Sequence, residues 1–325
     1  MNTGIVWWLV AAIVGVPLFL AGYIMLTERL MRRRDRRSGT LRAALWMAPA
    51  LILIVVFFLY PTISTIIMSF KDASSEHFVG LKNYARIFTD ENMLIVLRNN
   101  LAWLVFFTLV TLTLGLLFAI LTDRVRYESA AKSLIFMPMA VSFVAAGIIW
   151  KFMYEYQPQG MKQTGTVNAL LSALIPHFEP KAWLFDTHYN NAALILVGIW
   201  MWTGYAMTIL SAGLKGIPTD VMEAARIDGA SEFQILRHIT LPLLAPTITV
   251  VATTLIINVL KIFDIVYVMT NGNLGTDVIA NRMYKEMFNY HNFGQASAIA
   301  VILLIVIVPV MVMNIKRFRQ GGTNA

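Results

Sequence analysis

The chain has 325 residues, of which 58% are hydrophobic and 14% charged, with a mean hydropathy of +0.67. Soluble domains are nearer half apolar and a quarter charged, so this composition indicates a membrane protein rather than a soluble domain. The net charge of +8 comes from basic residues beside apolar runs, so nucleic-acid binding is not expected; the absence of cysteine excludes disulfides and thiolate sites.

Seven apolar runs are long enough to cross a bilayer, which takes about 20 helical residues. They predict an all-α, polytopic membrane protein with spans at 5–27, 43–67, 99–122, 133–153, 191–214, 244–269 and 295–314. No basic residue precedes the first run and a dense arginine cluster follows it, so it is expected to be a retained helix and not a signal peptide. Residues 1–42 would then form an extra N-terminal helix and linker, and residues 43–325 the main transmembrane domain.

The distribution of Lys and Arg predicts the orientation of these spans. The loops after the first, third and fifth runs, together with the C-terminal tail, hold 16 of the 26 basic residues, and the opposite loops hold seven. Positive loops stay in the cytoplasm, so the N-terminus is expected outside and the C-terminus inside. The cluster Arg32–Arg37 fits this role and binding to anionic lipid.

The segment 215–243, between the fifth and sixth runs, is polar and rich in helix-forming residues. Pro218 precedes a first short helix, whose first turn we expect Thr219 or Asp220 to cap. The orientation rule places this segment in the cytoplasm.

Further along the same segment, the residues predict a sharp bend. Gly229 can adopt a backbone conformation that other residues avoid. Ser231 and Gln234 have the spacing of a capping box, which would start a second helix, and Pro242 is expected to end it. The result would be a bent, water-facing element for docking another protein, the alternative being an ordinary amphipathic loop.

This segment also carries a spaced pattern. Glu223-Ala224-Ala225 is followed after three residues by Gly229, and after nine more by Ile239-x-Leu241-Pro242. The pattern resembles the cytoplasmic loop of binding-protein-dependent ABC import permeases. The resemblance extends from about residue 43 to the C-terminus, and the tract 271–293 is more similar to permeases for α-glucosides and related oligosaccharides.

The resemblance implies a type I ABC importer permease with a six-helix core, to which the first helix is an addition. It implies an ATPase dimer, a second and different permease subunit, and an extracytoplasmic solute-binding protein as partners, in a bacterial or archaeal cytoplasmic membrane. The loop would couple to the ATPase, with Glu223 pairing or capping and Gly229 bending. The other residues assigned to this contact are Ala224, Ala225, Arg226, Asp228 and Pro242.

The sequence shows no enzyme site. It contains no phosphate-binding loop, dinucleotide fingerprint, zinc-protease motif or nucleophile elbow. The five histidines lie in predicted loops and have no metal-ligand spacing. We therefore expect no metal or cofactor, and ATP hydrolysis on a separate subunit.

Polar residues within the sixth run are candidates for the translocation pathway. Charges inside a membrane cost at least ~2.5–3.5 kcal/mol each, so they usually face a bundle interior or a watery cavity. Lys261 and Asp264 are three residues apart and could pair on one helix face. Together with Thr254 and Asn258 they predict a polar stripe that hydrogen-bonds sugar hydroxyls, the alternative being hydrogen bonding between helices.

Trp200, Trp202 and Tyr205 lie in the fifth run and could supply aromatic faces for a sugar ring. The alternative is ordinary packing in the core or against lipid. Gly198 and Gly204, like Gly115 and Gly147, are expected to allow close helix packing, and Pro138 to kink the fourth span.

Two other functions stay open. One is a permease for another polar solute, such as a glycerophosphate or a polyol. The other is a self-contained secondary transporter, which would need internal repeats and carboxylates deep in the membrane. The sequence shows no such repeat and a single candidate carboxylate, Asp264.

Overall fold

The computed structural model describes residues 7, 14–15, 17–18, 21–29 and 39–321. These residues form helices and loops, with one isolated antiparallel bridge between Lys71 and Phe78. The prediction of an all-α protein is therefore confirmed. The chain divides into two compact units, Met1–Ser64 and Thr65–Ala325. Part of the predicted span 5–27 and the whole cluster Arg32–Arg37 fall outside the described residues.

The first unit contains helix α2 (Gly39–Ile54) and the π-helical turn η2 (Val55–Leu59), and α3 (Tyr60–Met68) crosses into the second unit. Ala43–Met68 is one continuous helix that is long and apolar enough to cross a membrane. It corresponds to the predicted span 43–67.

In the second unit, four further helices are long and apolar enough to cross a membrane. The first consists of α5 (Glu91–Ala102), the π-helical turn η3 (Trp103–Phe107) and α6 (Thr108–Thr122). The others are α10 (Asn190–Lys215), the helix Glu232–Leu260 and the apolar part of α16 (Phe293–Gly321). With Ala43–Met68, the described residues hold five such helices, or six if one bent pair counts as a span.

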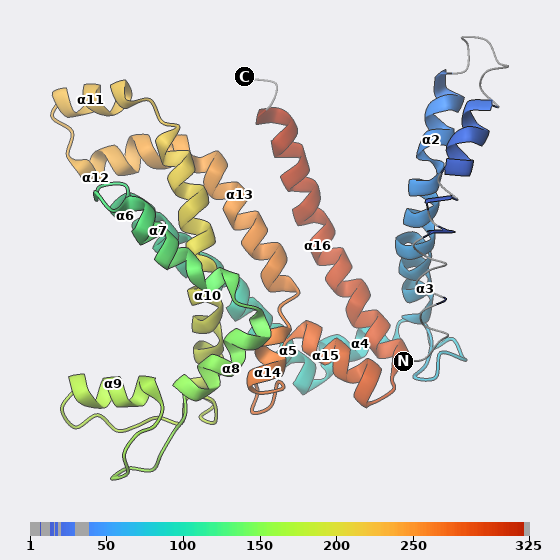
Figure 1. Ribbon diagram of the computed structural model, residues 1–325. Helices are drawn as coiled ribbons and strands as arrows, with labels where there is room; N and C mark the ends of the chain where they lie inside the picture. Colours follow the sequence, from blue (N-terminus) through green and yellow to red (C-terminus); the bar gives the residue numbers. More distant parts are fainter. Residues whose placement is uncertain (1–6, 8–13, 16, 19–20, 30–38, 322–325) are drawn as a thin grey trace. The chain divides into compact units, whose positions relative to one another are not determined.

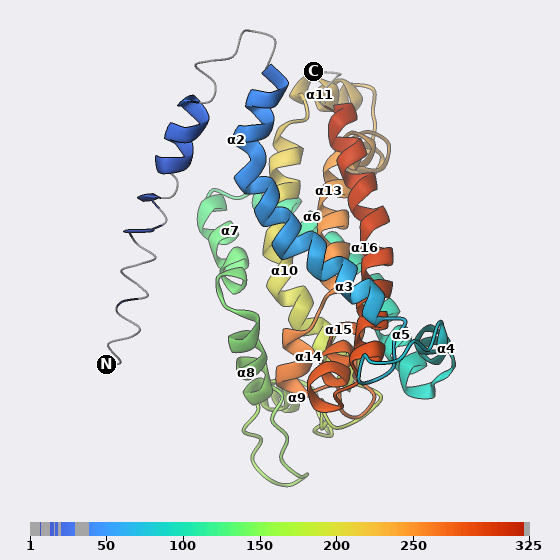
Figure 2. The ribbon, with the colours of Figure 1, turned by 90° about the vertical axis from the view of Figure 1, so that its right-hand side faces the viewer.

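Shorter helices lie at the two ends of the second unit. At one end are α4 (Lys82–Thr89), α9 (Thr166–Leu174), α14 (Asp264–Met269) and α15 (Ile279–Tyr284) with its π-helical extension η6 (Lys285–Asn289). Helix α11 (Thr219–Ile227) lies at the opposite end, where α16 also finishes (Figures 1 and 2). Helix α11 is thus separated from α4, α9, α14 and α15 by the length of the bundle.

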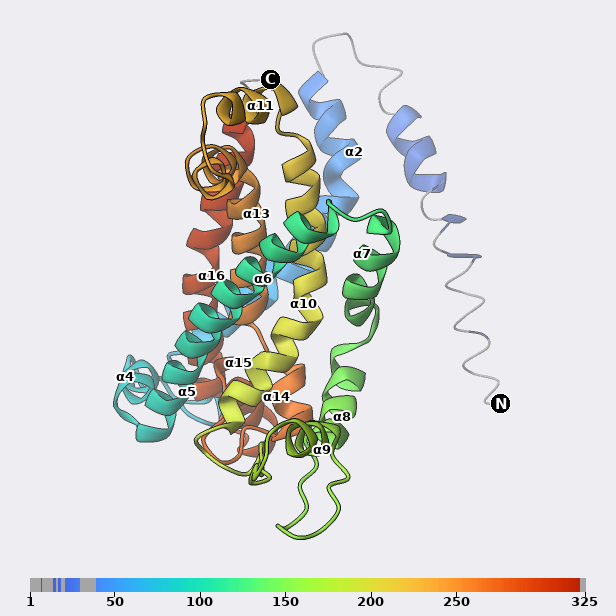
Figure 3. The ribbon, with the colours of Figure 1, turned by 90° about the vertical axis from the view of Figure 1, so that its left-hand side faces the viewer.

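Helix α10 is the centre of the second unit, and α6 lies along it (Figure 3). Glycines make this contact close. A methyl group on Gly115 would lie 2.6 Å from the Ala206 Cβ, and one on Gly198 would lie 2.9 Å from the Trp103 ring. The prediction that these glycines serve close packing is confirmed.

The fourth predicted span, 133–153, is not one straight helix. Helix α7 (Glu128–Phe136) ends in the 3-10 turn η4 (Met137–Ala140), and α8 (Phe143–Met153) starts afresh at an angle of 99°. Pro138 lies in η4, where it cannot donate a backbone hydrogen bond. Ser142 then caps α8 by accepting a 3.2 Å hydrogen bond from the Ala145 amide. The expected kink is therefore a complete break.

Two expectations about the sixth span are wrong. Pro242 does not end a helix, because α12 (Glu232–Ile235), the π-helical turn η5 (Leu236–Thr240) and α13 (Leu241–Leu260) form one continuous helix. The Leu241 amide bonds to the Leu236 carbonyl, and this wider turn relieves the clash that proline causes in an α-helix. The helix then ends at Leu260, well before residue 269, and α14 is separate.

Candidate functional site: a docking segment and a polar pocket

Helix α11 begins without the side-chain cap expected from the sequence. Its N-cap is Pro218, and no side chain caps the first turn, so neither Thr219 nor Asp220 has the predicted role. Both residues instead lie inside the first turn. Asp220 still stabilises this end of the helix, because its negative charge opposes the positive end of the helix dipole.

The bend after α11 forms as predicted. Asp228 is the C-cap, and Gly229 follows with a φ of +82°. The Ala230 amide donates to the Ala225 carbonyl at 3.0 Å, and the Gly229 amide donates to the Arg226 carbonyl at 3.1 Å. This pair of hydrogen bonds is a Schellman motif, which requires a left-handed residue at the position of Gly229.

The second helix of the segment is fixed by the predicted capping box. The Ser231 amide donates to the Gln234 Oε1 at 2.8 Å, and the Gln234 amide donates to the Ser231 Oγ at 3.3 Å. Two backbone donors at the helix start are thereby satisfied. The bend between α11 and α12 is therefore closed by backbone and side-chain bonds on both sides.

Exposed ion pairs link the two arms of the bend. The Arg226 Nε lies 2.9 Å from the Glu232 Oε1, and Arg124, from the loop after α6, lies 3.3 Å from the other Glu232 oxygen. The hydrogen bond to Glu232 raises the pKa of the Arg226 guanidinium above its ordinary value. These side chains are all about half-exposed, so solvent screens each pair and its contribution to stability is small.

Glu223 differs from its charged neighbours. It is exposed, and within the described ranges its carboxylate has no ion pair or hydrogen bond. Ala224 is also exposed. The Glu-Ala-Ala face of α11 is therefore available to a group from another chain.

Two exposed apolar side chains flank this face and were not singled out from the sequence. Ile227 is 86% exposed and Phe233 68% exposed. Phe233 borders a pocket of about 700 Å³ beneath α11, whose wall also includes Met222, Glu223 and Ile235. Isolated exposed apolar residues are common, but here Ile227 and Phe233 lie with the exposed Val221 on one short bent element. In the sequence, the only signal for Ile227 was that it is the one large apolar residue in Glu223–Asp228.

A second site lies where α13 and α14 are interrupted. A pocket of about 190 Å³ is lined by Phe107, Phe143, Trp202, Asn258, Val259, Lys261, Ile262, Phe263 and Asp264. The structure thus brings together four of the predicted pathway residues. Thr254, Trp200 and Tyr205 do not line this pocket.

The predicted polar stripe is not formed as one helix face. Thr254 and Asn258 lie in α13, Lys261 is the residue after its end, and Asp264 is the first residue of α14. Among the described residues, neither Lys261 nor Asp264 forms an ion pair. The broken helix places both charged groups at the pocket without pairing them, because the turn at 261–263 removes the three-residue helical spacing.

Aromatic rings form one side of the pocket. Trp202 stacks on Phe143, with centroids 6.4 Å apart, and meets Tyr205 edge-on at 5.5 Å. Trp200 instead meets Trp150 at 5.6 Å and lines a separate pocket that includes Pro138 and Thr203. Phe143 was missed from the sequence because only the break at Ser142 brings it here. No group of three metal-ligating side chains occurs in the part of the chain that the structure describes.

Comparison with known proteins shows to which family this chain belongs. Residues 111–318, which include the segment 215–243 and every residue that lines the pocket except Phe107, match the family described as "Binding-protein-dependent transport system inner membrane component". The chain belongs to this family. It is thus an inner-membrane component of a binding-protein-dependent transporter, and the resemblance seen in the Glu-Ala-Ala segment is confirmed.

Two curated relatives are similar over most of their length. The permease is 55% identical over 275 residues to the osmoprotective compounds uptake permease protein GgtC of Synechocystis, covering 85% of this chain and 98% of that one. It is 43% identical to the alpha-glucoside transport system permease protein AglF of Rhizobium meliloti, covering 89% and 86%. Among solved structures, a bacterial alginate ABC transporter chain matches with a TM-score of 0.72 at 20% identity, covering 86% and 96%, which shows a shared fold.

Proposed function

We propose that the chain is a permease subunit of an ATP-driven importer for a sugar or oligosaccharide such as an α-glucoside. An extracytoplasmic solute-binding protein delivers the solute, a second and different permease completes the pathway, and an ATPase dimer docks on α11 and α12. The observation that best supports this proposal is that a chain of this family contains the bent α11–α12 segment. Its Glu223 and Ile227 are exposed, and the Glu223 carboxylate forms no ion pair or hydrogen bond in the described residues.

The proposed orientation has the N-terminus outside and the docking segment in the cytoplasm. Two independent features support it. The loops that together hold 16 of the 26 Lys and Arg residues include the segment 215–243, and α11 lies at the same end of the second unit as the end of α16 (Figure 1).

Closure of the ATPase pair would move α11 and α12 together. Helix α12 continues without interruption into α13, so Glu232–Leu260 acts as one rod of 29 residues, roughly 40 Å long. Its far end is the break at 261–263, where Lys261, Ile262 and Phe263 line the pocket. A displacement at the docking end therefore changes the pocket directly, and hydrolysis on the partner resets it.

The pocket favours a neutral, polyhydroxylated solute. It offers one cation, one anion and the Asn258 amide beside the Phe143–Trp202 pair. Such groups can hydrogen-bond hydroxyls while the rings cover the apolar face of a sugar. Similarity to permeases named for osmoprotective compounds and for α-glucosides supports the same class. A glycerophosphate is the second candidate, because Lys261 has no anionic partner in the described part of the chain.

Reconstitution tests this function. The permease, its second subunit, the ATPase and the solute-binding protein are placed in vesicles with ATP, and uptake of a labelled α-glucoside is measured. ATP-dependent uptake that requires all components is expected. Uptake by the permease alone under an ion gradient would contradict the proposal and favour a secondary transporter.

The docking assignment has its own test. Glu223→Arg reverses the charge of the unpaired carboxylate, so it should abolish uptake and loosen the ATPase during co-purification. Asp220→Asn, on the same helix, is the matched control and should retain both. Intact uptake and co-purification in Glu223→Arg would show that α11 is not the docking element.

A further inference from the structure

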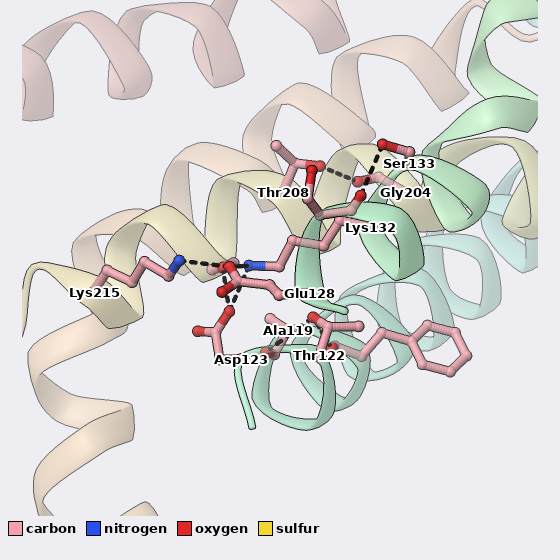
Figure 4. A network of polar contacts seen from close by, with 12 residues as sticks. Ala119, Thr122, Asp123, Glu128, Lys132, Ser133, Gly204, Thr208 and Lys215 are labelled. Atoms are coloured by element: carbon pink, nitrogen blue, oxygen red, sulfur yellow. Dashed lines mark hydrogen bonds and ion pairs between the residues drawn. The ribbon is translucent and has the colours of Figure 1, made fainter. Parts of the chain in front are cut away.

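A charged cluster joins three helices of the second unit (Figure 4). Its members come from the end of α6, the first turns of α7 and the last turns of α10: Asp123, Glu128, Lys132, Ser211 and Lys215. We call it the Lys132 cluster. Lys215 is the last residue of α10, and α11 starts at Thr219, so the cluster is the point from which the docking helix extends.

Lys132 is the centre of this cluster. Its ammonium lies 2.5 Å from the Asp123 Oδ1 and 2.6 Å from the Glu128 Oε1, and it also donates to the Ser211 hydroxyl. An ammonium has three donors, and all three are used. The Lys132 side chain is only 18% exposed. Lys132 therefore holds one position instead of sampling solvent.

The other members cross-link the three helices. The Ser211 hydroxyl donates to Asp123 at 2.8 Å, and Lys215 lies 2.5 Å from the Glu128 carboxylate that Lys132 also contacts. Figure 4 shows the Glu128 carboxylate between the two ammonium groups. Two acids and two lysines alternate, so every charge has an opposite partner.

Helix α7 is held to α10 at a second point as well. A methyl group on Gly204 of α10 would lie 2.5 Å from the Phe136 Cα, so the backbones of the two helices are in direct contact. With the Lys132 cluster at its start and Gly204 at its end, α7 is attached to α10 along its whole length. The two helices can move as one body.

The break after α7 separates the pair α7 and α10 from a second pair of packed helices, α8 and α14. Helix α8 packs on α14, with a methyl group on Gly147 predicted to lie 3.1 Å from the Val268 side chain. Phe143, the first helical residue beyond the break, lines the 190 Å³ pocket and stacks on Trp202 of α10. A rotation of α7 and α10 relative to α8 would therefore change this ring pair.

We propose that Lys132 is a positioning residue that makes α7 follow α10, so that movement of the docking helix bends the chain at Val141–Ser142 and displaces Phe143 from Trp202. This inference rests on the proposed function and extends it by a second route from the ATPase to the pocket, beside the rod Glu232–Leu260. Two of its members, Asp123 and Lys215, also line the pocket beneath α11; the proposed role of the cluster is to keep two helices together.

The test measures coupling in the reconstituted importer. Lys132→Met keeps the length of the side chain and removes its charge. The number of solute molecules imported per ATP hydrolysed is expected to fall at least tenfold, while assembly and basal ATP hydrolysis stay near wild type. Lys132→Arg should recover most of the coupling, and Arg126→Gln, which removes an exposed charge from the same loop, is the matched control.

A spin label gives an independent reading. The permease has no cysteine, so Val141→Cys provides a single labelling site in the break. Its spectrum should change on ATP binding in the otherwise wild-type complex and stay unchanged when Lys132→Met is added. A purely structural role for Lys132 would lower the yield of complex without separating hydrolysis from uptake.

The outcomes separate this inference from the proposed function. No ATP-dependent uptake by the wild-type complex would refute both. Normal uptake per ATP in Lys132→Met, with a working wild type, would refute the role of Lys132 alone. If that variant assembles poorly, Glu128→Gln decides, because it removes the carboxylate shared by both lysines, and wild-type coupling there would equally overturn the inference.

Discussion

The φ of +82° at Gly229 predicts how substitutions at this position change ATPase binding. An alanine in this conformation costs roughly 1–2 kcal/mol, because its Cβ approaches the following carbonyl. A methyl group on Gly229 meets no atom within 4 Å, so the cost lies in the backbone alone. If docking requires this bend, Gly229→Ala should weaken ATPase binding about 5- to 30-fold, since 1.4 kcal/mol is a factor of ten.

Asparagine separates backbone strain from steric clash. It tolerates the left-handed conformation better than alanine, so Gly229→Asn should bind the ATPase more tightly than Gly229→Ala. Gly229→Pro should abolish binding, since its φ is fixed near −65° and it loses the amide that bonds to the Arg226 carbonyl. Equilibrium binding of the ATPase to the permease in nanodiscs measures all three. Tighter binding by alanine than by asparagine would refute the strain argument and indicate a crowded contact with the partner.

Further substitutions test three other parts of the structure. Ile227→Glu should weaken ATPase association at least tenfold without changing thermal stability, because this side chain is 86% exposed; a lowered melting temperature would instead show a folding role. Gly204→Ala should lower the free energy of unfolding by ~1–3 kcal/mol, since the new methyl group would overlap the α7 backbone. Gly216→Ala is the control and should leave the free energy of unfolding nearly unchanged. Thermal unfolding of the two variants tests this difference. Lys261→Met and Asp264→Asn each leave the pocket with a net charge, so each should raise the KM for a neutral glucoside several-fold. The double variant has a neutral pocket again, and a KM as high as that of the single variants would contradict the argument from charge balance.

Local features were predictable where neighbouring residues determine them. The capping box of Ser231 and Gln234 and the bend at Gly229 depend on residues within a few positions of each other, and both form as expected. The close approach at Gly115 and Gly198 was likewise predicted from residue size. Hydropathy located the long spans, because burial in a bilayer depends on composition more than on detail.

The two prolines show where such reasoning fails. Pro138 was expected to kink a helix and lies at a break of 99°, whereas Pro242 was expected to end a helix and lies inside one. The difference is the turn before each residue. A π-helical turn precedes Pro242 and accommodates its ring, and the sequence does not reveal which turn will widen.

The Lys132 cluster and the pocket depend on long-range contacts. Lys132 and Ser211 are 79 positions apart, and Phe143 meets Trp202 across two helices. Periodicity along one segment carries no information about such pairs. The charged residues at Lys261 and Asp264 were found, but their arrangement was not, because a break in the helix after Leu260 replaced the assumed continuous face.

The unbroken helix Glu232–Leu260 also restricts how this chain can vary in length. Each residue of an α-helix turns its successor by about 100° and advances it by about 1.5 Å. Deleting one residue of α13 before Asn258 would therefore turn Asn258 away from the pocket or shift the start of α12, with no loop inside the helix to absorb either change. Natural variants of this permease should gain or lose residues in the segment 155–189, while the spacing from Glu232 to Lys261 stays constant.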